Sequence, residues 1–356
     1  MEKVELEGRT KSFALQLITF SQFEFLKFED QMSRPEAQNV STLEPADLAP
    51  APEPPTVQAE GADRNSKFEI RNSKLIGDEH WTTVIEPHGR LFDLKLGELW
   101  RYRDLIYLFV RRDFVAQYKQ TILGPAWHFL QPLLTTAMFT VVFGRIARIP
   151  TDGVPPFLFY MTGTVLWAYF SAVLLGTAGT FTANAHIFGK VYFPRLAVPV
   201  SLVLSRLIAF AIQFFFLLGF LAYFMWRGSN VAPNACVLAT PVLLLMMAAL
   251  GLGLGVIVSA LTTRYRDLAV LVGFGVQLLM YATPIIYPLS VLPEPYRTWA
   301  ALNPIAPVVE LFRYAYLGAG TVSTGLLAYS VAVIAAILFV GVVMFNRVER
   351  TFMDTV

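Results

Sequence analysis

The sequence contains few charged residues and almost no cysteine. Only 15% of its 356 residues are Asp, Glu, Lys or Arg, whereas a soluble domain carries about 25%, so a soluble enzyme is not expected. The single cysteine, Cys236, excludes a disulfide framework and every cysteine-ligated zinc or iron–sulfur site. The four histidines form neither an HExxH nor an HxxxH pair, so we expect no metal site and no cofactor bound by this chain.

Charge is distributed unevenly along the chain. Residues 1–95 contain 17 acidic and 11 basic residues (net −6), whereas residues 96–356 contain 9 and 17 (net +8). Residues 34–63 are rich in Pro, Ala and Glu and have too little apolar surface to offset the entropy cost of ordering them. We therefore interpret residues 1–90 as a mostly disordered N-terminal extension.

The remainder of the chain contains six apolar stretches long enough to cross a bilayer, which takes about 20 residues. They cover residues 129–149, 157–180, 199–226, 235–261, 268–288 and 324–345. An even number of spans places both termini on one side of the membrane. The segments on that side contain eleven Lys and Arg residues and the segments on the opposite side contain five, so we assign the termini to the cytoplasm. We predict an all-α integral membrane protein, with the six spans in residues 127–347 and a short cytoplasmic tail in residues 348–356.

The predicted spans lack acidic residues, and the chain lacks a nucleotide-binding loop. None of the nine Asp and Glu residues after position 95 lies in a span, which argues against an ion-coupled transporter. Gly189-Lys190 is followed by Val191 and does not complete a GxxxxGK[ST] motif. Energy for any transport must therefore come from elsewhere. The one embedded charge, Arg206, either snorkels to the cytoplasmic headgroups, which we favour, or has a functional role.

Residues 91–126 are predicted to form a cytoplasmic amphipathic interface helix. Apolar residues recur at three-to-four spacing, with charged residues on the rest of the wheel. The apolar positions are Leu99, Tyr102, Ile106, Phe109 and Val110, and the charged positions are Arg101, Asp104 and Arg111. Gly124-Pro125 then predicts a turn into the first span.

Two cytoplasmic loops are candidates for contact with a partner. Residues 183–195 are short, basic and aromatic, and we expect them to expose more apolar side chain than an idle loop. We favour insertion into a partner's groove over packing against the chain's own helix ends. The shorter loop at residues 262–267 is either a contact point or a positive-inside anchor.

The outer connection over residues 289–320 is unusually long and rich in proline. It predicts two short helices broken near Asn303-Pro304, which either cap a pathway from outside or form an interfacial cover without a gating role. Aromatic residues crowd the second and third spans. We expect most of them to face lipid, although Tyr or Trp rings facing a lumen would suit sliding glycans.

Several short motifs, taken in order around six spans, identify a family. Residues 96–356 resemble the membrane subunit of a type-2 ABC exporter, in the group that exports O-antigen, capsule or teichoic acid chains. The motifs are Trp100-Arg-Tyr-Arg-Asp104, Arg112-Asp113, the run from Tyr118 to Trp127, Lys190-Val-Tyr-Phe-Pro-Arg195, Arg266-Asp267, Tyr281-Ala-Thr-Pro284, and Asn303-Pro304 with Glu310 and Arg313.

The resemblance implies a permease without enzymatic activity in the bacterial cytoplasmic (inner) membrane. It implies a complex of two copies of this chain and two ATP-binding subunits, which bind ATP and Mg. This complex would export a lipid-linked polysaccharide. The alternatives are a permease of the same class for a drug or lipid, and an integral-membrane transferase. The resemblance also gives roles to the interface helix, to the cytoplasmic loops and to the outer connection.

Under this resemblance, the loop between spans two and three couples to the ATP-binding subunit, and spans one and five line the channel. The coupling residues are His186, Ile187, Phe188, Gly189, Lys190, Val191, Tyr192, Phe193, Pro194, Arg195, Arg266 and Asp267. The interface-helix residues are Trp100, Arg101, Arg103, Asp104, Arg112, Asp113, Tyr118 and Lys119. The channel and gate candidates are Phe139, Phe143, Tyr160, Trp167, Tyr169, Tyr281, Pro284, Tyr287, Asn303, Pro304, Glu310 and Arg313.

Overall fold

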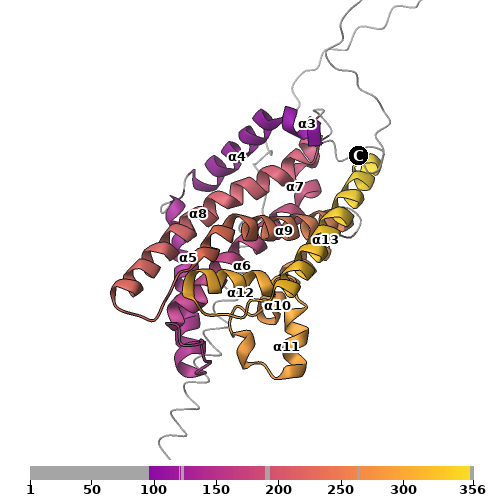
Figure 1. Ribbon diagram of the computed structural model, residues 1–356. Helices are drawn as coiled ribbons and strands as arrows, with labels where there is room; N and C mark the ends of the chain where they lie inside the picture. Colours follow the sequence, from indigo (N-terminus) through magenta and orange to yellow (C-terminus); the bar gives the residue numbers. More distant parts are fainter. Residues whose placement is uncertain are drawn as a thin grey trace, which may run out of the picture. The chain divides into compact units, whose positions relative to one another are not determined.

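A computed structural model describes residues 96–119, 121, 124–188, 193–262, 265 and 267–352, all within Gly89–Val356. The extension predicted for residues 1–90 lies outside these residues. Every regular element in the described part of the chain is helical, which confirms the all-α prediction (Figure 1). In order, the elements are α3 (Leu96–Arg101), α4 (Arg103–Tyr118), η1 (Gly124–Ala126), α5 (Trp127–Phe139), η2 (Thr140–Ile146), α6 (Pro156–Ala178), α7 (Thr180–Phe188), α8 (Ala197–Trp226), η3 (Ala235–Ala239), α9 (Thr240–Thr262), α10 (Leu268–Ala282), η4 (Leu289–Val291), α11 (Glu294–Ala301), α12 (Ala306–Leu317) and α13 (Thr324–Phe352).

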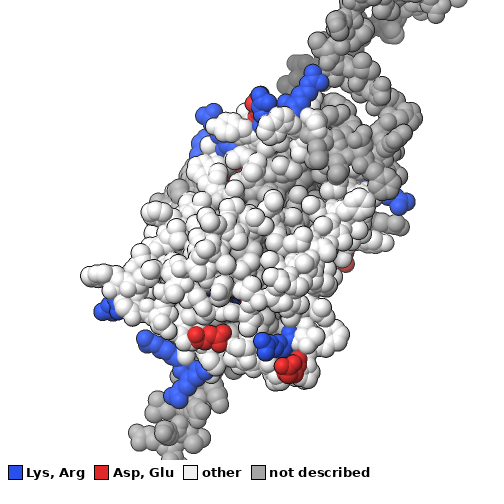
Figure 2. Space-filling view, in the orientation of Figure 1, with Lys and Arg blue, Asp and Glu red and all other residues white. Residues whose placement is uncertain are grey.

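Five of these helical segments are long and apolar enough to cross a membrane. They are Trp127–Ile146 (α5 with the π-helix η2), Pro156–Ala178, Ala197–Trp226, Ala235–Thr262 and Thr324–Val348. On the face shown in Figure 2, charged side chains gather at two opposite ends, and the band between them is almost entirely uncharged. These features are typical of a multi-pass membrane protein.

The fifth expected span, over residues 268–288, is shorter than its hydropathy predicts. The expected span ran to residue 288, but α10 is a 15-residue apolar helix that ends at Ala282. The reason is local, because Pro284 disfavours helical geometry at the residue before it. Thr283 accordingly has φ −96° and ψ 143°, an extended conformation.

Helices α6 and α9 form the centre of the bundle. α6 packs against α8, α9 and α5, and α9 packs against α6 and α13. Of the most apolar 18 residues of α6, 78% are buried within the protein, against 11% for the first span. Glycines permit the close approach, because a Cβ at Gly255 would overlap the Thr177 side chain and one at Gly341 would lie 2.6 Å from the Gly253 carbonyl oxygen.

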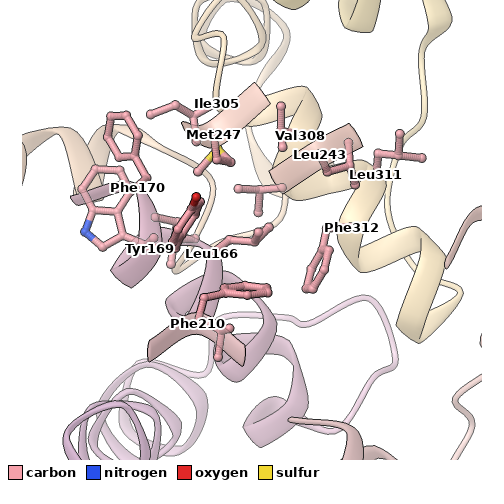
Figure 3. Close-up of a cluster of buried hydrophobic side chains, with 14 of the residues drawn as sticks. Leu166, Tyr169, Phe170, Phe210, Leu243, Met247, Ile305, Val308, Leu311 and Phe312 are labelled. Carbon is pink, nitrogen blue, oxygen red and sulfur yellow. The ribbon is translucent and has the colours of Figure 1, made fainter. Parts of the chain in front are cut away.

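The largest hydrophobic cluster lies where α6, α8, α9 and α12 meet (Figure 3). The burial of α6 corrects the expectation that the aromatic rings of the second span mostly face lipid. Five of these rings are buried inside the protein, because other helices surround α6; hydropathy does not distinguish a protein neighbour from a lipid. They are Phe159, Tyr160, Trp167, Tyr169 and Phe170. In α8 the outcome is mixed, since Phe210 is buried and Phe215 is 73% exposed.

Candidate functional sites at the two ends of the bundle

The interface segment consists of two helices, α3 and α4, interrupted at Tyr102, and α4 packs along α8 (Figure 1). Ile106 and Phe109 are buried, whereas the charged positions of the predicted pattern are exposed. The amphipathic pattern is thereby confirmed. Gly124 has φ +49°, a left-handed conformation that suits glycine, at the turn before α5.

Five phenylalanines connect the interface helix to the predicted coupling segment. The Phe109 ring lies 5.7 Å from Phe193, which lies 5.8 Å from Phe188. Phe188 continues the contacts to Phe181 at 6.0 Å, and Phe181 stacks on Phe345 of α13 at 4.7 Å. These rings, with Ile106, form a buried group that we call the interface cluster.

The interface cluster changes the interpretation of the loop between α7 and α8. Phe188 and Phe193 were expected to be exposed for a partner, but they are 2% and 6% exposed. They pack against the chain's own helix ends, which was the alternative interpretation. The Arg195 side chain is also buried, with its guanidinium 5.5 Å from the Phe188 ring centre. Both ends of the predicted coupling segment are therefore anchored.

Several predicted coupling residues cannot be described structurally. Gly189, Lys190, Val191, Tyr192 and Arg266 lie outside the described residues. His186 and Ile187 belong to the helical backbone of α7, but their side chains lie outside the described set, as does that of Tyr118 in α4. Pro194 is half-buried, and Asp267 is exposed directly before α10.

Charged side chains on the interface helix pair with their sequence neighbours. Arg112 contacts Asp113 at 2.8 Å, and its guanidinium lies 4.9 Å from the Phe109 ring centre. Arg103 and Asp104 are 3.9 Å apart and largely exposed. The remaining predicted interface residues, Trp100, Arg101 and Lys119, are also exposed.

The embedded Arg206 reaches the end of the interface helix. Its Nη1 donates to the Gln117 Oε1 at 3.4 Å, where α8 runs beside the last turn of α4. The Arg206 side chain therefore contacts the interface helix.

The opposite end of the bundle contains the predicted pair of short helices. α11 and α12 are separated by residues 302–305, which confirms the break at Asn303-Pro304. The Asn303 Nδ2 donates to the Thr283 Oγ1 at 2.9 Å, and its Oδ1 accepts from the Ile305 N–H at 3.1 Å. Asn303 therefore joins the start of α12 to Thr283, the residue directly after α10, and the half-buried Pro304 lies within this break.

Glu310 and Arg313 lie on α12 and are each 1% exposed. Arg313 donates to the carbonyl oxygens of Pro284 and Ile285 at 2.6 Å each, and its Nη1 lies 3.5 Å from the Glu310 carboxylate. Burial lowers the pKa of Arg313 to about 10, and the Glu310 carboxylate opposes this shift. The guanidinium therefore remains charged at neutral pH.

The aromatic channel candidates divide into buried and exposed residues. Phe139 and Phe143 approach Tyr160 at 6.2 and 6.5 Å, in a cluster that also includes Tyr287. Trp167 and Tyr169 belong to the main core within a single chain. Tyr281 of α10 is 45% exposed.

The first span and α10 leave apolar side chains uncovered in the single chain. The exposed residues are Leu134, Val141 and Ile146 in the first span and Val270, Leu271, Phe274, Leu278 and Tyr281 in α10. Only Thr136 and Val276, respectively, are buried. These faces are free to contact lipid or another protein.

Sequence reasoning missed the hydrogen-bond partners that hold the α12 region. Thr283 and Thr321 bond to Asn303 and Glu310, and the Asn234 side chain donates to the Tyr314 carbonyl at 2.9 Å. These pairs are 11 to 80 residues apart in the chain, so no local pattern reveals them.

Comparison with known proteins gives a consistent result. The family described as "ABC-2 type transporter" matches residues 104–317. An O-antigen export system permease protein of Klebsiella pneumoniae is 27% identical over 256 residues, which is 70% of this chain and 94% of that protein. A Myxococcus xanthus protein of the same name is 31% identical over 221 residues, covering 61% of this chain and 81% of its own length. A polysialic acid transport protein of Escherichia coli is 22% identical over 247 residues, 68% of this chain and 93% of that protein.

Proposed function

Because the chain belongs to the ABC-2 type transporter family, we propose that it is the permease of an ATP-driven exporter for a cell-surface polysaccharide. The observation that carries this proposal is the match to two O-antigen export permeases over 94% and 81% of their lengths. A relative named for polysialic acid transport supports a polymer rather than a drug as substrate. These relatives have transport names, which agrees with a role other than catalysis.

The proposed exporter contains two copies of this chain and two ATP-binding subunits, which bind ATP and Mg. The exposed apolar faces of the first span and α10 support pairing with a second copy around a shared path. The substrate that passes between those faces is a polysaccharide attached to a lipid carrier. A long polymer requires many weak, similar contacts, because tight binding at one place would stop its advance.

The ATP-binding subunits dock at the end of the bundle that carries α4. The exposed charges of α4 lie beside the interface cluster, whose buried rings include Phe188 and Phe193, the residues before and after positions 189–192 in the sequence. This arrangement supports a firmly anchored contact that passes movement of the ATP-binding subunit to α4, α7 and α8. Basic residues at this end support its location in the cytoplasm, with both termini on that side of the inner membrane.

Affinity purification from mild detergent tests the proposal. We expect a Walker-motif subunit to accompany the tagged chain and to hydrolyse ATP, and we expect cells without the chain to lose surface polysaccharide. Replacing Lys190 and Tyr192 with Ala should remove the ATP-binding subunit, whereas Arg297→Ala in α11 should retain it. A chain that purifies alone, with surface polysaccharide intact after its deletion, would contradict the proposal.

A further inference from the structure

Arg313 and Glu310 hold both ends of the long connection between α10 and α13. Arg313 binds the carbonyl oxygens of Pro284 and Ile285, where the connection begins. Glu310, one turn earlier on α12, accepts the Thr321 N–H at 3.0 Å with its Oε2, three residues before α13 begins. We call these five residues the clasp.

The surroundings of the clasp leave little room for rearrangement. The Arg313 guanidinium lies 3.8 Å from the Phe159 ring centre of α6. A Cβ at Gly163 of α6 would lie 2.9 Å from the Ile285 side chain and 3.0 Å from Arg313. The surroundings of Gly320 (φ +137°) are similarly crowded, because a Cβ there would lie 2.9 Å from the Glu310 carbonyl oxygen. The clasp therefore joins α6, α12 and both ends of the connection.

α12 itself is enclosed by the protein. All of its residues except Tyr314 are buried. The loop before η3 adds further bonds, because the Asn234 N–H and side chain donate to the carbonyls of Ala315 and Tyr314. Tyr316 shares a 2.7 Å hydrogen bond with Thr240 at the start of α9. An outward swing of α12 would break these contacts and expose a buried ion pair.

The rest of α10 is held much more loosely. Val270 is 79% exposed and Phe274 is 58% exposed, and Val276 is the only buried residue of the helix. Immediately beyond the helix, Thr283, Pro284, Ile285 and Ile286 are all buried. α10 is therefore fixed at the clasp and free along most of its length.

We propose that Arg313 is a positioning residue that makes the extracellular end of each protomer one rigid block, about which α10 pivots. The inference rests on the proposed export function and specifies how the path opens. Movement begun at the cytoplasmic end tilts α10 about the clasp and separates the blocks of the two copies. The exit opens between these blocks, and α12 does not swing out of its own protomer.

A reversible cross-link tests whether α12 stays in place. A Cβ at Gly318, the residue after α12, would lie 3.5 Å from the Ala232 Cβ, which suits a disulfide, and both residues are exposed. The variant A232C/G318C is made in a C236A background and assayed as the full complex in inside-out vesicles. Because Gly318 has φ +74°, G318C alone in the same background is the reference.

We expect ATP-dependent polymer uptake to remain within twofold when the cross-link is closed by diamide. Loss of uptake on oxidation, with recovery in dithiothreitol, would overturn the inference, because it would mean that α12 has to leave its site. Absence of ATP-dependent uptake in the unsubstituted complex would instead overturn the proposed export function. The two failures are therefore distinguishable.

A second measurement tests Arg313 directly. R313K keeps the charge but cannot hold two carbonyls with one planar fork, and R297K in α11 is the matched control. We expect polymer moved per ATP hydrolysed to fall about 2- to 30-fold in R313K, with assembly and ATP hydrolysis retained. Equal ratios for the two variants would contradict the role of Arg313. If R313K does not assemble, the cross-link in the chain with Arg313 intact still decides the question.

Discussion

Arg112 and Arg313 have similar partners at opposite ends of the molecule and very different surroundings. Each pairs with a carboxylate close in sequence and lies over a phenylalanine ring, at 4.9 Å from Phe109 and 3.8 Å from Phe159 respectively. The Arg112 side chain is 44% exposed, whereas that of Arg313 is 2% exposed and also binds two carbonyls. The same chemical pair therefore lies on an accessible surface in one case and is enclosed by protein in the other.

The comparison predicts that the largest difference in stability will be between the variants that lack one or the other arginine. Arg313→Ala leaves a buried carboxylate and two buried carbonyls without their partner, and should cost about 3–5 kcal/mol. Thermal unfolding of the purified chain in detergent measures this loss, with Arg112→Ala as the control. Equal unfolding midpoints for the two variants would mean that burial does not distinguish the pairs.

A smaller effect is expected from neutralising the buried carboxylate. Glu310→Gln keeps an oxygen to accept the Thr321 N–H but removes the negative charge beside Arg313, and should cost about 1–3 kcal/mol. Thr321→Ala retains the backbone donor and should cost much less. If unfolding curves show Thr321→Ala to be as harmful as Glu310→Gln, charge compensation is not the important factor.

Asn303 extends the comparison to a neutral group at the end of the bundle that carries α11 and α12. Asn303→Ala loses the bonds to Thr283 and to the Ile305 N–H, and should cost about 1–2 kcal/mol. Limited proteolysis between α11 and α12 reports the loosening. Asn303→Asp keeps the acceptor for Ile305 and should be cleaved more slowly than Asn303→Ala; equal cleavage of the two variants would show that the bond to Thr283, which both lose, dominates.

The smallest effect on stability is expected at the exposed pair. Arg112→Ala should change the stability of the isolated chain by less than about 1 kcal/mol, because solvent screens the ion pair. Co-purification of the ATP-binding subunit should nevertheless decrease. Asp113→Ala provides a comparison of opposite charge, and retention of the partner in both variants would remove this pair from the proposed docking surface.

The sequence predicted those features that depend on local pattern. Hydropathy located the spanning helices, the three-to-four periodicity identified the buried face of α4, and Asn303-Pro304 marked the break between α11 and α12. Prediction failed where burial depends on which other part of the protein covers a residue. The buried rings of α6 and the anchored Phe188 and Phe193 are apolar residues whose cover is protein, and composition alone does not specify that cover. The bonds from Arg313 to residues 28 and 29 positions earlier were equally inaccessible.

The clasp also has a consequence for biosynthesis. The ribosome delivers Pro284 and Ile285 first, then Glu310 and Arg313 together on one helical turn, and Thr321 last. The two charges can neutralise each other as α12 leaves the ribosome, before the final helix exists. The Glu310 bond cannot form until residue 321 has been made, so the clasp closes only after the whole of α10, α11 and α12 has been synthesised.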